Sequence, residues 1–392
     1  MDTRHEGLFH YRSFSDKERK NLAILELIRK KGPISRTEIS HITDINIVSI
    51  SNYVKGYIDK GVALETGCDV STGGRRPELV ELNTRGIYVI GIDMSISGIA
   101  AVITDLSANL IAKVKIPVSR DKADQMDMKA MEAIEEVLKK SGVNISAVRA
   151  MGAGIGGTNN RFAALRSAVH EKFGIDAFMG SDAACAAFGE KRLNREAGAE
   201  DLLYMYSDIG CGIIIRGDIY FGAGGSAGEM QFSREHISKE EDALFFKGAQ
   251  YLKPWGADLG ITQIARYEIE KGIGTKIVSL AKGDLASITT EVVIEAAKQD
   301  DDLASDIVHN AGMNLGIRVA YLVNLFNPEV VVIGGGVEKA GELILDPIRK
   351  TVHKLAFSDP ADMVKIITSA LGEDAVSLGA ASLAIREIFL KA

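Results

Sequence analysis

The chain has 392 residues, of which 46% are hydrophobic and 25% are charged, and its formal net charge is −7. This composition is typical of folded globular domains and excludes both a disordered chain and a protein that grips nucleic acid through overall positive charge. Three scattered cysteines exclude a disulfide framework or zinc ribbon, and the absence of a long apolar run or a signal-peptide core predicts a cytoplasmic protein without a membrane span.

Residues 1–83 are nearly balanced in charge, whereas the rest of the chain carries the acidic excess. Turn signals and apolar periodicity divide this segment into three helices and two strands, at about residues 16–31, 35–42, 47–60, 62–66 and 79–82. Asp16 is expected to cap the first helix, and Ser35 with Glu38 forms a capping box for the second. Three helices followed by a hairpin predict a winged helix-turn-helix, a DNA-binding fold.

The third helix is predicted to have an apolar inner face and a polar outer face. Ile50, Val54, Tyr57 and Ile58 recur at helical spacing and should face the core. Serine and asparagine can bond base edges, and lysine suits a phosphate. The polar residues left on the outer face are Ser49, Ser51, Asn52 and Lys55.

The segment between the two strands carries Arg75 and Arg76 directly after two glycines. Adjacent arginines on a flexible tip suit contact with a minor groove or with phosphates. Ser35 and Arg36, at the start of the second helix, complete the predicted DNA-binding set. The alternative is a small helical protein-interaction module with a solvated charged face.

The remaining three hundred residues predict two related α/β lobes. A buried strand, an acid-bearing turn and a second strand occur at residues 88–106 and again at 202–216, which indicates a duplicated unit. We therefore predict a multidomain α/β protein: a DNA-binding domain over residues 1–83, a first lobe over 84–185 and a second lobe over 186–375. The last helix, within residues 376–392, is expected to pack back on the first lobe.

Three turns that follow strands are candidates for binding phosphate, because backbone N–H groups and small residues let an anion approach closely. They are marked by Asp93, by Gly210 with Gly212, and by Gly335. The pattern predicts a nucleotide cleft between the lobes. The alternative is that these glycines serve tight packing of strands against helices.

At this point the motifs resemble those of the ROK family (repressors, open reading frames and kinases), and specifically its regulators with an N-terminal winged helix. The resemblance spans nearly the whole chain and rests on residues 71–77, 91–93, 181–183, 210–215, 222–229 and 332–337. It implies an actin-like, ribonuclease-H-like pair of lobes. Kinases of the family phosphorylate sugars with ATP, and its repressors change their DNA binding in response to a sugar or a protein partner.

Position by position, the resemblance implies a degraded kinase site. Asp182 matches the general base that takes the proton of a sugar hydroxyl, but the asparagine that usually precedes it is Ser181. Glu229 matches a sugar-binding glutamate, whereas the zinc-binding histidine three positions later is Phe232. The loop over residues 253–263, where the family has its zinc cysteines, has none, so zinc is expected to be absent.

These departures favour a transcriptional regulator, expected to be a repressor, whose lobes sense a ligand without a cofactor. The polar groups expected around that ligand are Thr158, Asn159, Ser181, Asp182 and Glu229; the alternative is an empty cleft kept for its shape. A homodimer or higher homo-oligomer on a pseudopalindromic DNA operator, with a sugar or sugar derivative as effector, is expected. Two other interpretations stay open: an active sugar kinase that uses ATP and Mg²⁺, or a regulator controlled by a protein partner or a non-sugar ligand.

Overall fold

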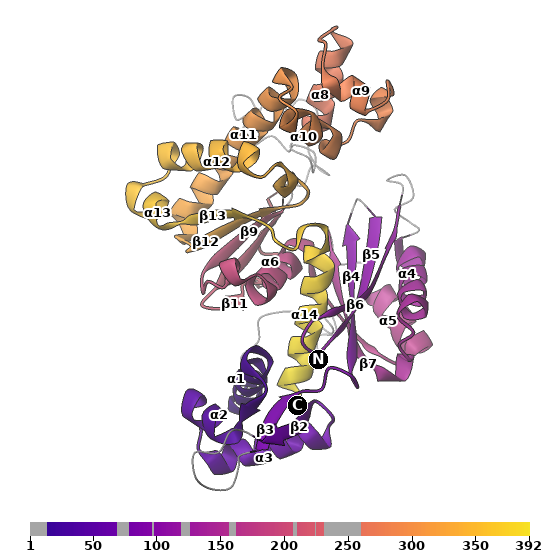
Figure 1. Cartoon of the computed structure of the whole chain (residues 1–392), viewed down its shortest axis with the longest axis vertical. Helices are drawn as coiled ribbons and strands as arrows, with labels where there is room; N and C mark the ends of the chain where they lie inside the picture. Colours follow the sequence, from indigo (N-terminus) through magenta and orange to yellow (C-terminus); the bar gives the residue numbers. More distant parts are fainter. Residues whose placement is uncertain are drawn as a thin grey trace. The chain divides into compact units, whose positions relative to one another are not determined.

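The computed structural model describes residues 14–68, 78–95, 98–118, 126–156, 162–206, 210–223, 225–230 and 260–392 (Figure 1). The chain divides into two compact units. The first unit comprises residues 1–185 together with 376–392, and the second comprises residues 186–375.

The N-terminal part of the first unit contains three helices and a small sheet. Its elements are α1 (Asp16–Lys31), β1 (Ile34–Ser35), α2 (Arg36–Thr43), α3 (Ile47–Asp59), β2 (Ala63–Cys68) and β3 (Glu78–Leu82). The strands pair antiparallel in the order β1-β3-β2. The three predicted helices and the hairpin are therefore confirmed. One cap differs from the prediction: Ser15, not Asp16, caps α1, and it forms a capping box with Glu18.

A compact apolar core holds these helices together. Ile24, Leu25 and Ile28 of α1 are fully buried, and so are Ile50 and Val54 of α3. At about 1.5–3 kcal/mol for each large side chain withdrawn from water, this core supplies the main stabilisation of the three-helix arrangement. The predicted inner face of α3 is confirmed.

The first unit continues into a five-stranded mixed sheet with helices on both faces. Its strands are β4 (Tyr88–Ser95), β5 (Gly98–Asp105), β6 (Leu110–Ile116), β7 (Val148–Ile155) and β8 (Asp176–Ser181), in the order β6-β5-β4-β7-β8. Its helices are α4 (Met126–Ser141), α5 (Phe162–Phe173), the start of α6 (Asp182–Leu193) and α14 (Ala375–Leu390). Helices α4 and α5 share one apolar cluster with the sheet, and α14 lies against the glycines of β4 and β7.

The second unit has a sheet of the same size. Its strands are β9 (Leu202–Tyr206), β10 (Gly210–Ile215), β11 (Asp218–Ile219), β12 (Val330–Gly334) and β13 (Lys365–Thr368). Its further helices are α8 (Ile261–Glu270), α9 (Lys276–Leu280), α10 (Thr290–Lys298), α11 (Asp302–Phe326), α12 (Glu342–Leu355) and α13 (Ser358–Met363). Helices α8 to α12 contribute side chains to the apolar cluster that includes the sheet residues Met205 and Val331.

The two sheets repeat one topology. The second sheet has the order β11-β10-β9-β12-β13, so β9 holds the central place that β4 holds in the first. In both sheets the central strand has one antiparallel and one parallel neighbour. Strand β4 pairs antiparallel with β5 and parallel with β7, and β9 pairs antiparallel with β10 and parallel with β12. This confirms the predicted duplication. None of the helices that the structure describes is long and apolar enough to cross a membrane.

Two of the predicted phosphate turns fall between paired strands. Ser95, the last residue of β4, pairs with Gly98 of β5, and residues 96–97 lie outside the described part of the chain. Gly210 and Gly212 lie at the start of β10, where they pair with Tyr206 and Tyr204, and residues 207–209 also lie outside the described part. Phosphate binding at these two turns stays a prediction.

Candidate nucleic-acid interface and ligand site

The junction between α2 and α3 is fixed by local hydrogen bonds. Asp44 ends α2 in a left-handed conformation, and the Ser40 hydroxyl donates to the Ile45 carbonyl at 2.6 Å. Asn46 then caps α3 by accepting a hydrogen bond from the Ser49 backbone N–H at 2.8 Å. These contacts set the direction of α3 from residues in its own turn.

The outward face of α3 carries Val48, Asn52 and Lys55, which are all exposed. Their spacing of four and three residues places them on one side of the helix, opposite the buried Val54. An amide, an ammonium and a branched apolar group side by side match what a DNA major groove offers: base-edge donors and acceptors, phosphates and thymine methyl groups. The structure therefore groups two of the predicted residues with one that the sequence analysis missed.

Val48 is the missed member of this face, and 68% of its surface is exposed. Four residues separate it from Asn52, so helical spacing was a signal that it shares the polar face. Val48 was not predicted as a site residue because it is apolar, and an apolar residue beside Ile47 and Ile50 is normally assigned to the core.

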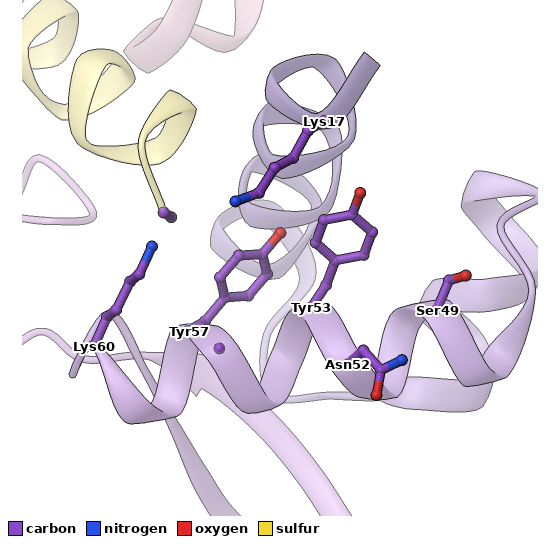
Figure 2. A pocket seen from close by; sticks show the side chains of 8 residues that line it. Lys17, Ser49, Asn52, Tyr53, Tyr57 and Lys60 are labelled. Carbon is purple, nitrogen blue, oxygen red and sulfur yellow. The ribbon is translucent and has the colours of Figure 1, made fainter. Parts of the chain in front are cut away.

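Ser49 and Ser51 flank that outward face and are less exposed than its three members. The Ser51 hydroxyl donates to the Ile47 carbonyl at 2.9 Å, which leaves its oxygen only as an acceptor. Ser49 faces a hollow of about 430 Å³ on the side of α3 nearest α1. Figure 2 shows this hollow, which is lined by Lys17, Ser49, Asn52, Tyr53, Gly56, Tyr57, Lys60 and Ala392.

Ser35 and Arg36 both make structural contacts. The Ser35 side chain is buried and accepts a hydrogen bond from the Glu38 backbone N–H at 3.2 Å. Arg36 forms ion pairs with Glu65 and with Glu78, the latter at 3.5 Å, which ties α2 to the base of the hairpin. These contacts give both side chains a structural role, and their contact with DNA stays a prediction.

Arg75 and Arg76, which complete the predicted DNA-binding set, lie outside the described residues. The hairpin on either side of them is described: β2 and β3 pair antiparallel, and their end residues Cys68 and Glu78 are partners.

The candidate ligand residues of the first unit gather at the carboxyl ends of parallel strands. Asp182 is the first residue of α6, directly after β8, and its carboxylate accepts a hydrogen bond from the Ala183 backbone N–H at 2.7 Å. The Ser181 hydroxyl accepts one from the Ala184 N–H at 3.2 Å. A Cβ placed on Gly156, after β7, would lie only 2.9 Å from Asp182 Oδ2. Thr158 and Asn159 lie outside the described residues.

The surroundings of Asp182 are unfavourable to charge. Only 8% of its surface is exposed, and this burial raises the pKa of its carboxyl group against the opposing effect of the Ala183 N–H. Burial, followed by the negative charges of Asp182 and Asp93, raises the pKa of the nearby Cys185 thiol. Asp93 of β4 and Asp182 are both buried and both act electrostatically on Cys185, and such a group of buried acids is a candidate functional site.

Glu229 lies in the second unit and is held at the edge of its sheet. The Cys211 backbone N–H donates to the Gly228 carbonyl at 2.7 Å, and Glu229 forms an isolated bridge with Gly210. Gly228 has a φ of 92°, and a Cβ there would lie 1.8 Å from the Cys211 carbonyl oxygen, so only glycine fits. This close approach places Glu229 beside β10 with an exposed side chain.

The third predicted phosphate turn follows β12. Its residues Gly335 and Gly336 have positive φ values of 83° and 101°, a backbone conformation that favours glycine. Its amide, however, is taken by the chain itself: the Gly336 N–H donates to Glu338 Oε2 at 2.6 Å. The sequence analysis missed Glu338. Among the described residues, no group of three or more histidine, cysteine, aspartate or glutamate side chains could hold a metal ion.

Comparisons with known proteins identify the family of the chain. A family model described as "ROK family" matches residues 89–232 and 264–387. The xylose repressor of Caldicellulosiruptor bescii is 28% identical over 392 residues, which covers 95% of this chain and 96% of the repressor.

Two solved structures share the fold. A ROK family transcriptional regulator, a homologue of the E. coli MLC protein, superposes with a TM-score of 0.74 at 20% identity, covering 95% of this chain and 96% of its own. A ROK family glucokinase from Streptomyces griseus, in complex with glucose and AMPPNP, gives a TM-score of 0.64 at 24% identity. The glucokinase match covers 99% of that enzyme but 76% of this chain.

Proposed function

Because this chain belongs to the ROK family, we propose that it is a sugar-responsive transcriptional repressor in which residues 1–83 form a DNA-reading winged helix. The observation that carries this proposal is the outward face of α3. Val48, Asn52 and Lys55 are exposed on a helix whose opposite side is locked into a core, as a helix that enters a major groove requires.

Each residue of this face has a distinct part in reading DNA. The Asn52 amide offers one donor and one acceptor, the pair that recognises adenine. Lys55 neutralises a phosphate and therefore contributes to affinity at every sequence. Arg75 and Arg76, between β2 and β3, are the proposed contacts to a minor groove or its phosphates.

The two α/β units form the sensor. We assign Ser181, Asp182 and Glu229 to recognition of sugar hydroxyl groups, together with Thr158 and Asn159. Carboxylates at strand ends suit this role, because they accept hydrogen bonds from several hydroxyls at once. A sugar that binds one arrangement of the units more tightly than the other shifts the population toward it and thereby changes DNA affinity.

Phosphoryl transfer is not part of this proposal. Catalysis of that reaction depends almost entirely on positioning the phosphates. The Gly336 amide, in the turn after β12, is occupied by Glu338, and residues 94–97, after Asp93, contain no glycine. The proposed protein therefore needs neither ATP with Mg²⁺ nor zinc, and Phe232 stands where the family resemblance places a zinc histidine.

We further propose that the protein acts as a homodimer or higher homo-oligomer. Two winged helices related by twofold symmetry read the two half-sites of a pseudopalindrome, and the separation of the helices sets the spacing of the half-sites.

The experiment that tests this proposal first selects a DNA operator from random sequences. The purified full-length protein selects ligands from a double-stranded DNA pool randomised over about three helical turns. The selected duplex is then labelled, and its binding is measured by fluorescence anisotropy as a function of salt, with and without pentoses, hexoses and N-acetylhexosamines. We expect the protein to bind a pseudopalindromic consensus sequence. The affinity should fall as salt rises and should change in the presence of one of the sugars.

Two results would contradict the proposal. One is a protein that enriches no sequence from the pool at low salt. The other is sugar-dependent release of ADP from ATP that the Asp182→Asn variant lacks, which would establish the sugar kinase instead. If the protein binds DNA sequence-specifically but responds to none of the sugars, its effector is another small molecule or a protein partner.

A further inference from the structure

Helix α14 connects the first unit's five-stranded sheet to its DNA-reading part. It contains 16 residues, so it spans about 24 Å. In Figure 1 it runs along the sheet and ends beside the N-terminal helices. Its two ends therefore have different neighbours, and each end is held by a different kind of contact.

The sheet holds α14 by direct backbone packing. A Cβ on Gly91 of β4 would lie 2.0 Å from the Ser377 carbonyl oxygen, and one on Gly152 of β7 would lie 2.0 Å from the Ala380 carbonyl oxygen. The helix backbone thus lies directly on the strands with no side chain between them. Contact this close leaves α14 no freedom to shift without moving the sheet.

The other end of α14 is held by a buried polar cluster. The Asn21 side-chain amide of α1 donates to the Leu390 carbonyl at 3.2 Å and to the Ala392 oxygen at 2.9 Å. The Tyr57 hydroxyl of α3 donates to Asn21 Oδ1 at 2.9 Å. Asn21 and Tyr57 are each only 1% exposed.

Lys60, directly after α3, adds a fourth bond at the rim of the cluster, where its ammonium donates to the Lys391 carbonyl at 3.1 Å. Figure 2 shows Tyr57 one turn from Tyr53 on the side of α3 that faces α1, with Lys60 at the end of the helix. The last carbonyls of a helix lack partners within the helix, so these side chains satisfy groups that would otherwise stay unpaired.

The direction of the Asn21 bonds is informative. An asparagine that served only the three-helix core would bond within that core, whereas the donors of Asn21 leave it for α14 and only its oxygen turns back to α3. If one partner of a buried hydrogen bond moves away, the other is left unsatisfied, which costs free energy. The cluster therefore favours a single orientation of α1 and α3 relative to α14. The bonds thus fix the direction of α3 relative to the sheet.

On the basis of the proposed function, we infer that Asn21 and Tyr57 are positioning residues that hold the DNA-reading helix at a set angle to the sensor through α14. Neither residue touches DNA in this scheme. Their effect is on the distance between the two reading helices of a dimer and so on the half-site spacing that the protein accepts.

The test compares three variants of the full-length protein. Tyr57→Phe removes the hydroxyl and keeps the ring, and Asn21→Leu removes the amide at similar volume. Tyr53→Phe makes the same chemical change one turn earlier on α3, outside the cluster, and is the matched control. Each is titrated with the selected duplex, with duplexes whose half-sites are one or two base pairs further apart, and with a single half-site.

Wild type and Tyr53→Phe are expected to lose about tenfold in affinity when one base pair is inserted, because the reading helices then miss their groove positions. Tyr57→Phe and Asn21→Leu are expected to lose much less on insertion and to bind the single half-site as wild type does. The double variant is expected to match Asn21→Leu, since the Tyr57 bond runs only to Asn21. A merely structural role would instead weaken half-site binding and leave the spacing preference unchanged.

A readout without DNA separates this inference from the proposed function. Amide hydrogen exchange over residues 386–392 is expected to accelerate in Tyr57→Phe and Asn21→Leu but not in Tyr53→Phe. Unchanged exchange there, or an unchanged spacing preference in both variants, would overturn the inference. A wild-type protein that binds no duplex would overturn the proposed function alone, and hydrogen exchange would then decide whether the cluster holds α14.

Discussion

The backbone N–H of Gly336 donates a hydrogen bond to the Glu338 carboxylate at 2.6 Å. Gly336 belongs to the glycine turn that ends β12, and its φ of 101° is the geometry that lets such a turn point an amide toward an anion. Here the anion is a side chain of the same turn. Burial raises the pKa of Glu338, and the Gly336 N–H opposes that rise by stabilising the carboxylate. The turn is thus filled by the protein's own acid.

This contact leads to a prediction about nucleotide binding. Glu338→Ala vacates the Gly336 amide and removes a negative charge that repels phosphate. We expect ADP to bind the variant roughly tenfold more tightly than wild type, measured by isothermal titration calorimetry. Glu342→Ala, which removes an exposed acid paired with Arg349, is the control. Equal ADP affinities in all three proteins would show that Glu338 does not exclude the nucleotide.

A second prediction concerns Val48, whose side chain is 68% exposed beside Asn52. Contact with a thymine methyl group would explain an apolar side chain on this face. Replacing one operator thymine at a time by deoxyuridine should then weaken wild-type binding at one position, by about 1 kcal/mol. Val48→Ala should bind both duplexes alike at that position. A wild-type protein insensitive to every such replacement would exclude the contact.

A third prediction separates affinity from specificity on the same helix. Lys55→Ala should weaken binding to all duplexes alike and reduce the slope of log affinity against log salt by about one. Asn52→Ala should instead cost about 1–3 kcal/mol on the selected duplex and relax the preference at one base pair. Lys298→Ala, an exposed lysine of the second unit, should change neither quantity. Equal salt slopes in Lys55→Ala and wild type would remove Lys55 from the interface.

The N-terminal helices were predictable because their information is local. Ile50, Val54 and Tyr57 recur at a period that only a helix satisfies, and the glycine and proline after α1 end that helix. The buried polar cluster of Tyr57 and Asn21 was not predictable, because it depends on the end of α14, which lies more than 300 residues away in the sequence.

Helix α6 escaped prediction for another reason. Residues 183–187 are small, apolar and buried on every side, so they show neither helical nor strand alternation. The role of two strand glycines was not predictable either. Gly91 and Gly152 sit within strands because α14 comes close, and the sequence alone does not separate a glycine kept for close approach from one kept for a turn.

A fourth prediction follows from the raised pKa of Asp182, which burial causes. Because the folded state holds its proton more strongly than the unfolded state, stability falls as pH rises above 3.8, the ordinary value, through the folded-state pKa. Asp182→Asn removes this titration and keeps an acceptor for the Ala183 N–H. The variant should melt at a higher temperature than wild type at neutral pH, and the difference should shrink toward pH 3.8. A pH-independent difference would contradict the assignment.

The last prediction tests the packing of α14 against the sheet by replacing each of three glycines, one at a time, with alanine. Alanine at Gly91 or Gly152 places a methyl group 2.0 Å from a helix carbonyl oxygen, so either the strand or α14 must move. Such overpacking costs about 1–3 kcal/mol or more, and both variants should lower the urea midpoint of the first unit. Gly56→Ala is the matched control, because nothing lies within 4 Å of its Cβ in the middle of α3. There alanine should raise stability by about 0.5–1 kcal/mol through its higher helix propensity. Since α14 also carries the bonds to Asn21, Gly152→Ala should in addition loosen the half-site spacing preference, whereas Gly56→Ala should keep it. A Gly152→Ala protein that retains both its stability and its spacing preference would mean that the backbone of α14 does not rest on β7.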